Sequence, residues 1–200
     1  MLPERAVLVP GTATLVLGDV HLGKGALHRQ AGVPLPDPAR SELAVIAELA
    51  QQVAARHVVI AGDLVHGIPA VGDELVHRIG HWVESVPFDV TLVAGNHDRR
   101  LVAQLGAAGL CVIRGSFDAG GVRVIHEPDD EPVPTISAHE HPVVVLRAGR
   151  DRLRLRCFAV DGTSLRLPAF GDLTGGREVE RRPGTRIAAI IGSGVSWMQA

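Results

Sequence analysis

Polar side chains with the chemistry of metal ligands recur along this sequence, each one directly after an apolar run typical of a strand. They are carboxylates, imidazoles and one amide: Asp19, His21, Asp63, Asn96, His126, His139 and His141. Such a donor set suits Mn, Fe, Zn or Mg rather than an ion bound by sulfur. These groups suffice for two ions that share one carboxylate. Two ions about 3.5–4 Å apart can hold a bridging hydroxide and clamp the oxygens of an in-line phosphoryl displacement. The set therefore predicts hydrolysis at phosphorus.

Two of these blocks, Asp19-Val20-His21 and His139-Glu140-His141, place their ligands two residues apart. On an extended backbone alternate side chains point to the same face, so each pair is expected to share a face. One such block alone is weak evidence, because an isolated Asp-x-His is usually a polar turn. Ligands bind at the carboxyl ends of strands in open α/β sheets, so repeated blocks at strand ends favour one shared centre.

Apolar periodicity predicts the elements that must position these residues. Strands are expected at residues 5–9, 13–18, 57–61, 88–94, 110–113, 135–138, 143–147, 152–159, 164–168 and 186–191. A hairpin around Gly120-Gly121 is expected to join residues 117–119 to 122–125. Helices are expected at residues 39–55, 73–85 and 99–106. Strands alternate with helices early and dominate later, which predicts an α/β (α+β) fold in a single domain, residues 1–200.

Composition excludes several classes of protein. The sequence is 46% hydrophobic and 21% charged, which indicates a folded chain rather than a disordered one. No apolar run approaches about 18 residues, so no membrane span is expected, and the first residues do not resemble a signal peptide. Cys111 and Cys157 lie in apolar runs and are expected to be reduced core thiols, which fits the cytoplasm.

Charge is divided unevenly along the chain. Residues 1–141 carry 10 Lys and Arg against 17 Asp and Glu, a net charge of −7, whereas residues 142–200 carry 10 against 5, a net charge of +5. A basic segment beside an acidic metal-binding one would suit an anionic substrate, although a solvated arginine-rich surface is the alternative. With only 3% aromatic residues, the chain has little material for stacking on single-stranded bases.

The order of the blocks resembles the calcineurin-like metallophosphoesterase superfamily. The matching blocks are Asp-x-His, Gly-Asp-x-x-His, Gly-Asn-His-Asp, a lone His after a strand, and His-x-His. More narrowly, the chain is similar over essentially its whole length to the ligase-associated DNA damage response endonucleases. The stretches that carry this similarity are residues 2–6, 18–24, 95–100 and 167–176. The resemblance implies a two-sheet β-sandwich flanked by helices, the αββα phosphoesterase fold.

The resemblance also implies a role for each block. Asp19, His21 and His141 would bind a first metal ion, Asp63 would bridge, and Asn96, His126 and His139 would bind a second. His97, which is not a ligand in the family, would stabilise charge on the substrate or protonate the leaving oxygen. Asp98 and His66 would orient His97 or touch the substrate. Arg99 and Lys24 are candidate phosphate contacts, with ordinary surface residues as the alternative. Ala138 stands where the superfamily usually has Gly, so no left-handed backbone is expected there.

The predicted function is that of a two-metal-dependent phosphodiesterase, a DNA endonuclease linked to DNA repair, that uses a metal-bound hydroxide. Two divalent ions are expected as cofactors, Mn first, with Fe, Zn or Mg as alternatives. A repair ligase or helicase partner is implied by the resemblance alone. Two other readings stay open: a phosphoesterase acting on nucleotides or other small phosphodiesters, and a non-catalytic metal-binding scaffold.

Overall fold

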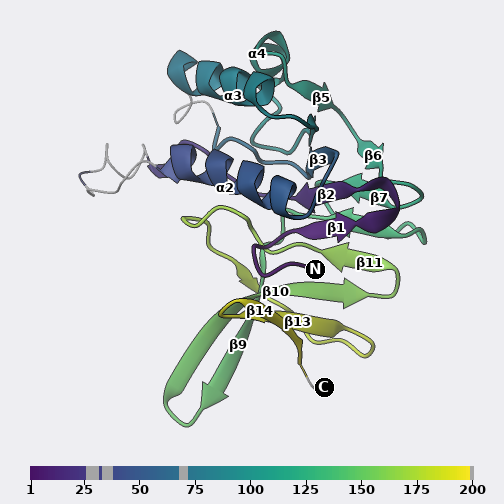
Figure 1. The fold of residues 1–200 in the computed structure, drawn as a ribbon. Coiled ribbons are helices and arrows are strands. Elements are labelled where there is room, and N and C mark those ends of the chain that lie inside the picture. Colours follow the sequence, from purple (N-terminus) through teal and green to yellow (C-terminus); the bar gives the residue numbers. More distant parts are fainter. Residues whose placement is uncertain (26–31, 33–37, 68–71, 199–200) are drawn as a thin grey trace.

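Two β-sheets packed face to face, with helices along one outer side, make up the architecture (Figure 1). The computed structural model describes residues 1–25, 32, 38–67 and 72–198. The first sheet contains, in spatial order, β1 (Val7–Val9), β2 (Thr14–Leu17), β3 (His57–Ile60), β4 (Asp89–Val93) and β5 (Cys111–Ile113). Strands β2 to β5 are parallel, and β1 runs antiparallel beside β2. The carboxyl ends of β2, β3 and β4 therefore lie at one edge.

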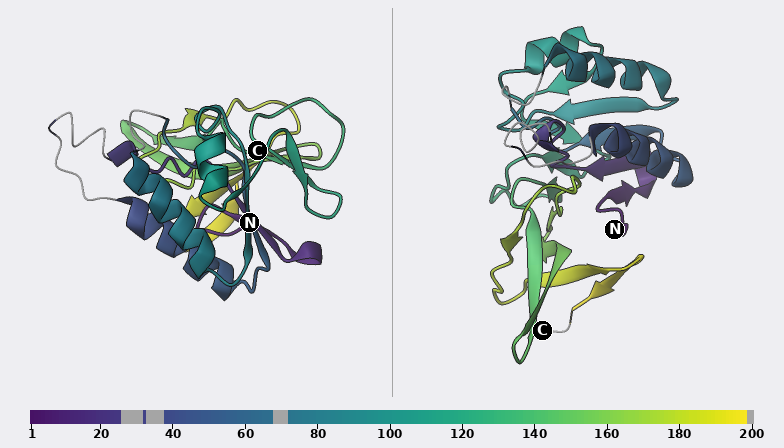
Figure 2. Two further views of the ribbon diagram at one scale, coloured as in Figure 1. Left: turned by 90° about the horizontal axis from the view of Figure 1, so that it is seen from above. Right: turned by 90° about the vertical axis from the view of Figure 1, so that its left-hand side faces the viewer.

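The helices cover the outer face of this first sheet (Figures 1 and 2). They are α2 (Pro38–Gln52), α3 (Asp73–Ser85) and α4 (Val102–Ala107). Their apolar side chains, among them Ile46, Ile79 and Leu105, form one buried cluster with Leu17 and Ile60 of the sheet. Burial of each such side chain stabilises the fold by about 1.5–3 kcal/mol, so this layer fixes the sheet that carries the first candidate ligands.

The second sheet packs against the inner face of the first. Its strands are β6 (Ser116–Asp118), β7 (Arg123–Ile125), β8 (Thr135–Ser137), β9 (Pro142–Ala148), β10 (Asp151–Asp161), β11 (Ser164–Arg166), β12 (Arg177–Glu178), β13 (Arg186–Ile191) and β14 (Gly194–Trp197). They follow the order β12-β9-β10-β11-β8-β7-β6, and β13 pairs with both β10 and β14. Between the sheets, Val16, Val59 and Val93 meet Phe158 and Leu167 in a second buried cluster. The mixed two-sheet fold with flanking helices confirms the expected class.

Element boundaries differ from expectation where the backbone turns. Helix α2 ends at Gln52 rather than at residue 55, because Ala54 adopts a left-handed conformation (φ 51°) that stops the helix. Helix α4 starts at Val102 rather than at residue 99, because Leu101 N–H bonds the Asp98 carbonyl in a turn before it. Strands β12 and β14 were not expected from the sequence. No helix among the described residues could cross a bilayer.

The two cysteines differ in environment. Neither is in a disulfide; Cys157 is fully buried in β10, whereas Cys111 is exposed. The expectation of a core thiol is therefore wrong for Cys111, because β5 is the edge strand of its sheet. Burial raises the pKa of the Cys157 thiol to about 12, which keeps it protonated and unreactive.

A thiol titration should separate these two environments. At about pH 8 we expect a disulfide reagent to modify one thiol per chain rapidly and the second only in denaturant. Absorbance of the released chromophore gives the count. Cys111→Ser should remove the fast phase, and rapid modification of both thiols in the native protein would contradict the burial of Cys157.

Candidate metal centre

The loops that carry the candidate ligands converge at the carboxyl edge of the first sheet. Asp19, Asp63 and Asn96 follow the parallel strands β2, β3 and β4. The first two loops are tied together, since Asp19 N–H donates to Gly62 O (3.0 Å) and His21 N–H donates to Asp63 O (2.9 Å). The remaining candidates, His126, His139 and His141, come from loops after β7 and β8 of the second sheet. Both sheets thus supply side chains to one place.

Asp19, His21 and His141 form a first group, whose potential ligand atoms lie within 4.8 Å of one another. Asp19 Oδ1, His21 Nε2 and His141 Nε2 are buried atoms without a hydrogen-bond partner among the described residues. Asp19 Oδ1 lies only 3.1 Å from His141 Nε2. Buried polar atoms rarely stay unpaired, and a carboxylate with two imidazoles is a donor set that divalent ions accept. The three residues therefore fit a metal ion.

The protonation state of His21 agrees with this assignment. Burial, together with the nearby imidazoles of His141, His66 and His97, lowers the pKa of His21 to about 2. A ligating imidazole must be neutral, so the environment already favours the form that binds a metal.

Asp63, His126 and His139 form a second group, again within 4.8 Å of one another. His126 Nε2 lies 2.9 Å from Asn96 Oδ1 and 3.2 Å from His139 Nδ1, so the amide joins the same group. Asp63 and His126 are buried, whereas Asn96 and His139 are exposed. The second group is therefore open to solvent on one side. One carboxylate, one amide and two imidazoles again fit a divalent ion without sulfur ligands.

Asp63 stands between the two groups. Its Oδ1 lies 3.5 Å from His126 Nε2 in the second group, and its Oδ2 lies 3.8 Å from His21 Nε2 in the first. Burial raises the pKa of Asp63, while the neighbouring His126 opposes the shift. Asp63 therefore presents one carboxylate oxygen to each group, which is the arrangement expected of a ligand shared by two metal ions.

The backbone of the candidate ligands is strained. Left-handed φ values occur at Asp19 (55°), His21 (54°), Asp63 (51°), His139 (70°) and His141 (49°). Each such non-glycine residue costs about 1–3 kcal/mol and persists only where its surroundings hold it. The extended backbone expected for the pairs Asp19/His21 and His139/His141 is therefore wrong, since left-handed residues do not alternate faces. Asp19 and His21 nevertheless share a group, whereas His139 and His141 divide between the two.

Ala138 is not among the left-handed residues of the described chain, as its substitution for Gly led us to expect. It packs closely instead: a Cβ added at Gly18 would lie 2.6 Å from Ala138 Cβ. The pair of small residues lets the loop after β8 approach the loop after β2.

Three imidazoles form a cluster beside Asp63. The rings of His66 and His97 are stacked, with centroids 5.1 Å apart and planes at 17°. His66 Nδ1 lies 3.1 Å from His21 Nδ1. The His97 side chain is 35% exposed, and its Nε2 lies 3.9 Å from Asp63 Oδ2. His97 therefore faces solvent next to the candidate centre, with His66 behind it.

Asp98 lies beneath the loop rather than at its surface. It is fully buried, and its carboxylate accepts hydrogen bonds from Gly95 N–H (2.9 Å) and Val65 N–H (3.2 Å). Burial raises its pKa to about 6, opposed by these two bonds. Asp98 thus joins the loop that carries His66 to the loop that carries His97.

The two candidate phosphate contacts lie in different surroundings. Arg99 is exposed and pairs with Glu127 Oε1 at 3.0 Å, at the edge of a pocket of about 310 Å³ that His126 also lines. Lys24 is half-buried, its backbone N–H donates to His21 O (3.2 Å), and burial lowers the pKa of its amine. Both cations are near the centre, but Arg99 is already partly neutralised.

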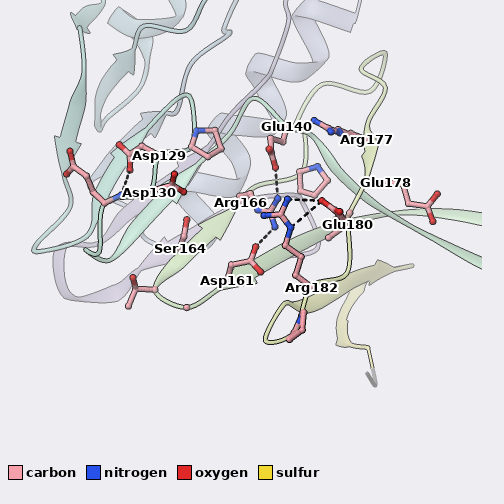
Figure 3. A pocket seen from close by; sticks show the side chains of 17 residues that line it. Asp129, Asp130, Glu140, Asp161, Ser164, Arg166, Arg177, Glu178, Glu180 and Arg182 are labelled. Atoms are coloured by element: carbon pink, nitrogen blue, oxygen red, sulfur yellow. Dashed lines mark hydrogen bonds and ion pairs between the residues drawn. The ribbon is translucent and has the colours of Figure 1, made fainter.

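A larger cavity of about 820 Å³ opens beside the centre (Figure 3). Glu140, between the two ligands of the last block, lines it, but none of the candidate ligands does. Two of the arginines that line it are paired: Arg166 bonds Glu140 and Asp161, and Arg182 bonds Glu180 (Figure 3). Further acidic side chains line it as well, so this cavity is not the basic surface that the charge distribution led us to expect.

Two adjoining His and Asp groups at the strand ends of a two-sheet sandwich define a metal-dependent phosphoesterase. The chain belongs to the calcineurin-like phosphoesterase family, whose model matches residues 12–156. This family uses divalent metals, in agreement with the His and Asp groups above.

The structure is similar to the crystal structure of the nuclease MPE from Pseudomonas putida, with a TM-score of 0.82. The two chains are 28% identical, over 99% of this chain and 94% of that one. This match is consistent with the narrower resemblance to ligase-associated endonucleases. No curated protein matches the sequence.

Proposed function

We propose that the chain is a two-metal phosphodiesterase that cleaves DNA. The observation that carries the proposal is the position of Asp63, with one carboxylate oxygen 3.5 Å from His126 and the other 3.8 Å from His21. The similarity to a nuclease supports a nucleic-acid substrate. When bound, two divalent ions would activate a water molecule and neutralise charge on the phosphate.

Each candidate ligand then has a defined task. Asp19, His21 and His141 would hold the first ion, Asn96, His126 and His139 would hold the second, and Asp63 would be shared. The oxygen and nitrogen donors favour Mn, and they also accept Fe, Zn or Mg. Five of these residues have a left-handed backbone, and the contacts that maintain it would also position their side chains before any ion binds.

His97 acts on the substrate rather than on an ion. Its exposed ring, next to Asp63, can hydrogen-bond a phosphate oxygen or donate a proton to the leaving oxygen. The stacked ring of His66 restricts the rotation of His97, and Asp98 fixes the loop that carries it. His66 and Asp98 are thus positioning residues for His97.

A small phosphodiester is the second candidate substrate. Two observations favour it: Arg99 is engaged by Glu127, and the large cavity beside the centre carries an excess of acidic side chains. Both features reduce the attraction for a long phosphate backbone.

We further propose a role in DNA repair, in the cytoplasm, where unpaired thiols such as Cys111 persist. A repair ligase or helicase as partner follows from the family resemblance alone. Co-purification of a tagged chain with such enzymes, with and without nuclease treatment, tests for a direct contact.

The decisive experiment measures the hydrolysis of several substrates by a single preparation of the protein. A chromogenic phosphodiester, the matching monoester, and single- and double-stranded DNA are incubated with metal-free protein plus Mn, Mg or Zn. Diester and DNA cleavage that requires an added ion supports the proposal. Diester turnover with intact DNA would move the assignment to small substrates. Tight metal binding without any turnover would contradict catalysis and favour the scaffold.

A further inference from the structure

Residues 167–176, between β11 and β12, lie against the first group of candidate ligands, and we call this segment the supporting loop. Phe170 N–H donates to Gly18 O (2.9 Å), and Gly171 N–H donates to Asp19 O (3.0 Å). The backbone of Asp19 is therefore held through its carbonyl by this loop, in addition to the bond that its own N–H makes to the loop after β3.

The supporting loop packs closely against the backbone of the first group, and this contact continues into β12. A Cβ at Gly171 would lie 2.1 Å from Val20 O, so only glycine allows this contact. Directly after the loop, Arg177 N–H at the start of β12 donates to His141 O (3.0 Å). Within the loop, Gly176 also lies against His141, where an added Cβ would be 2.5 Å from His141 O. The loop and the start of β12 thus contact two members of the first group, Asp19 and His141.

Arg156 of β10 holds the supporting loop through its carbonyl groups. The guanidinium of this half-buried side chain donates to Ala169 O (2.6 Å), Gly171 O (2.9 Å), Asp172 O (3.0 Å) and Thr174 O (3.2 Å). A planar cation with five N–H donors is suited to gathering several carbonyls at once, which lysine cannot reproduce. Arg156 therefore fixes the curvature of the loop.

This support matters because Asp19 and His141 are strained. Their φ values of 55° and 49° are left-handed, and such residues relax unless neighbouring contacts restrain them. If the loop loosened, both residues could return to ordinary backbone, and their side chains would turn away from the first site. Between described residues, no hydrogen bond of the loop reaches Asp63, Asn96 or His126.

We propose that Arg156 is a positioning residue for the first metal ion, acting through the supporting loop on Asp19 and His141. The inference rests on the proposed two-ion function. Loss of Arg156 should weaken the first ion more than the second, because among the described residues the hydrogen bonds of the loop reach Asp19 and none of Asp63, Asn96, His126 or His139.

Calorimetric titration of metal-free protein with Mn tests this claim. The variants are Arg156→Gln, Arg156→Lys and the control Arg152→Gln, an exposed arginine of the same strand. We expect two ions in the wild type and in the control. In Arg156→Gln one ion should bind as before and the other about 10–100-fold more weakly, with Arg156→Lys between them.

Spectroscopy identifies which ion is weakened. The electron paramagnetic resonance spectrum of Arg156→Gln with one Mn should match that of His141→Ala rather than that of Asn96→Ala. An equal loss of both ions, or unchanged affinities, would overturn the inference, because a merely structural role would affect both sites together.

Hydrogen exchange gives a readout that needs no metal. In metal-free Arg156→Gln the amides of Phe170 and Gly171 should exchange faster than in the wild type, and unchanged exchange would also overturn the inference. A wild type that binds fewer than two ions would instead contradict the proposed function, while the exchange result still decides the role of Arg156. If Arg156→Gln does not fold, Arg156→Lys carries both measurements.

Discussion

Asp63→Ala should lower the rate of diester hydrolysis by a factor of about 10³ or more. Metal ions stabilise the transition state by several kcal/mol, and each tenfold change in rate corresponds to about 1.4 kcal/mol. This carboxylate faces both candidate sites, with oxygens 3.5 Å from His126 and 3.8 Å from His21. Its removal therefore affects both ions, unlike the loss of any other ligand. Steady-state kinetics with saturating Mn, together with calorimetric metal binding, measure both effects.

The same variant has a structural consequence that must be separated from catalysis. Asp63 Oδ1 also accepts a hydrogen bond from His97 N–H (3.0 Å), so the loop after β4 loses a restraint. Asp63→Asn, which keeps an acceptor oxygen, should retain the fold and still lose most of the activity. Asp151→Asn, at an exposed position, is the charge-matched control. Near wild-type turnover in Asp63→Asn would exclude a shared carboxylate.

His97→Ala should lower turnover by about 10²–10⁴-fold, the range for removal of a general acid or base, while two ions still bind. The prediction follows from the position of His97, whose ring is partly exposed beside Asp63 and stacked on His66. Turnover of a diester with a good leaving group should fall less than turnover of DNA, because such a leaving group needs no proton.

His81→Ala, an exposed imidazole on α3, serves as the matched control and should leave both rates unchanged. Loss of one ion in His97→Ala would identify this residue as a ligand instead. Equal losses for both substrates would favour charge stabilisation over proton donation.

The fold was predictable where one physical signal dominated. Helix α3 begins and ends as its apolar spacing predicted, because Leu75, Ile79 and Trp82 lie on one buried stripe. The two-residue strand β12 carries no apolar pattern, since both residues are exposed and its place depends on pairing with β9. Such an element follows from tertiary contacts, which local sequence does not encode.

The candidate site, too, was predictable from the sequence in some respects and not in others. The residue types of the ligands and their order predicted two adjoining groups. Their left-handed backbone could not be predicted, because nothing in an Asp or a His requires it. Nor could the role of Arg156 be predicted: an arginine within the β10 run indicates an exposed position, whereas it reaches carbonyl groups of a distant loop. The ion pair between Arg99 and Glu127 could not be predicted from the sequence either.

The division of ligands between the two sheets has a consequence for biogenesis. The first sheet supplies Asp19 and Asp63, but His139 and His141 are synthesised only after β8, and the supporting loop later still. A nascent chain emerging from the ribosome can therefore complete the first sheet before all the proposed ligands have been made. On the proposed two-ion function, full metal occupancy would then report that the second sheet has closed onto the first.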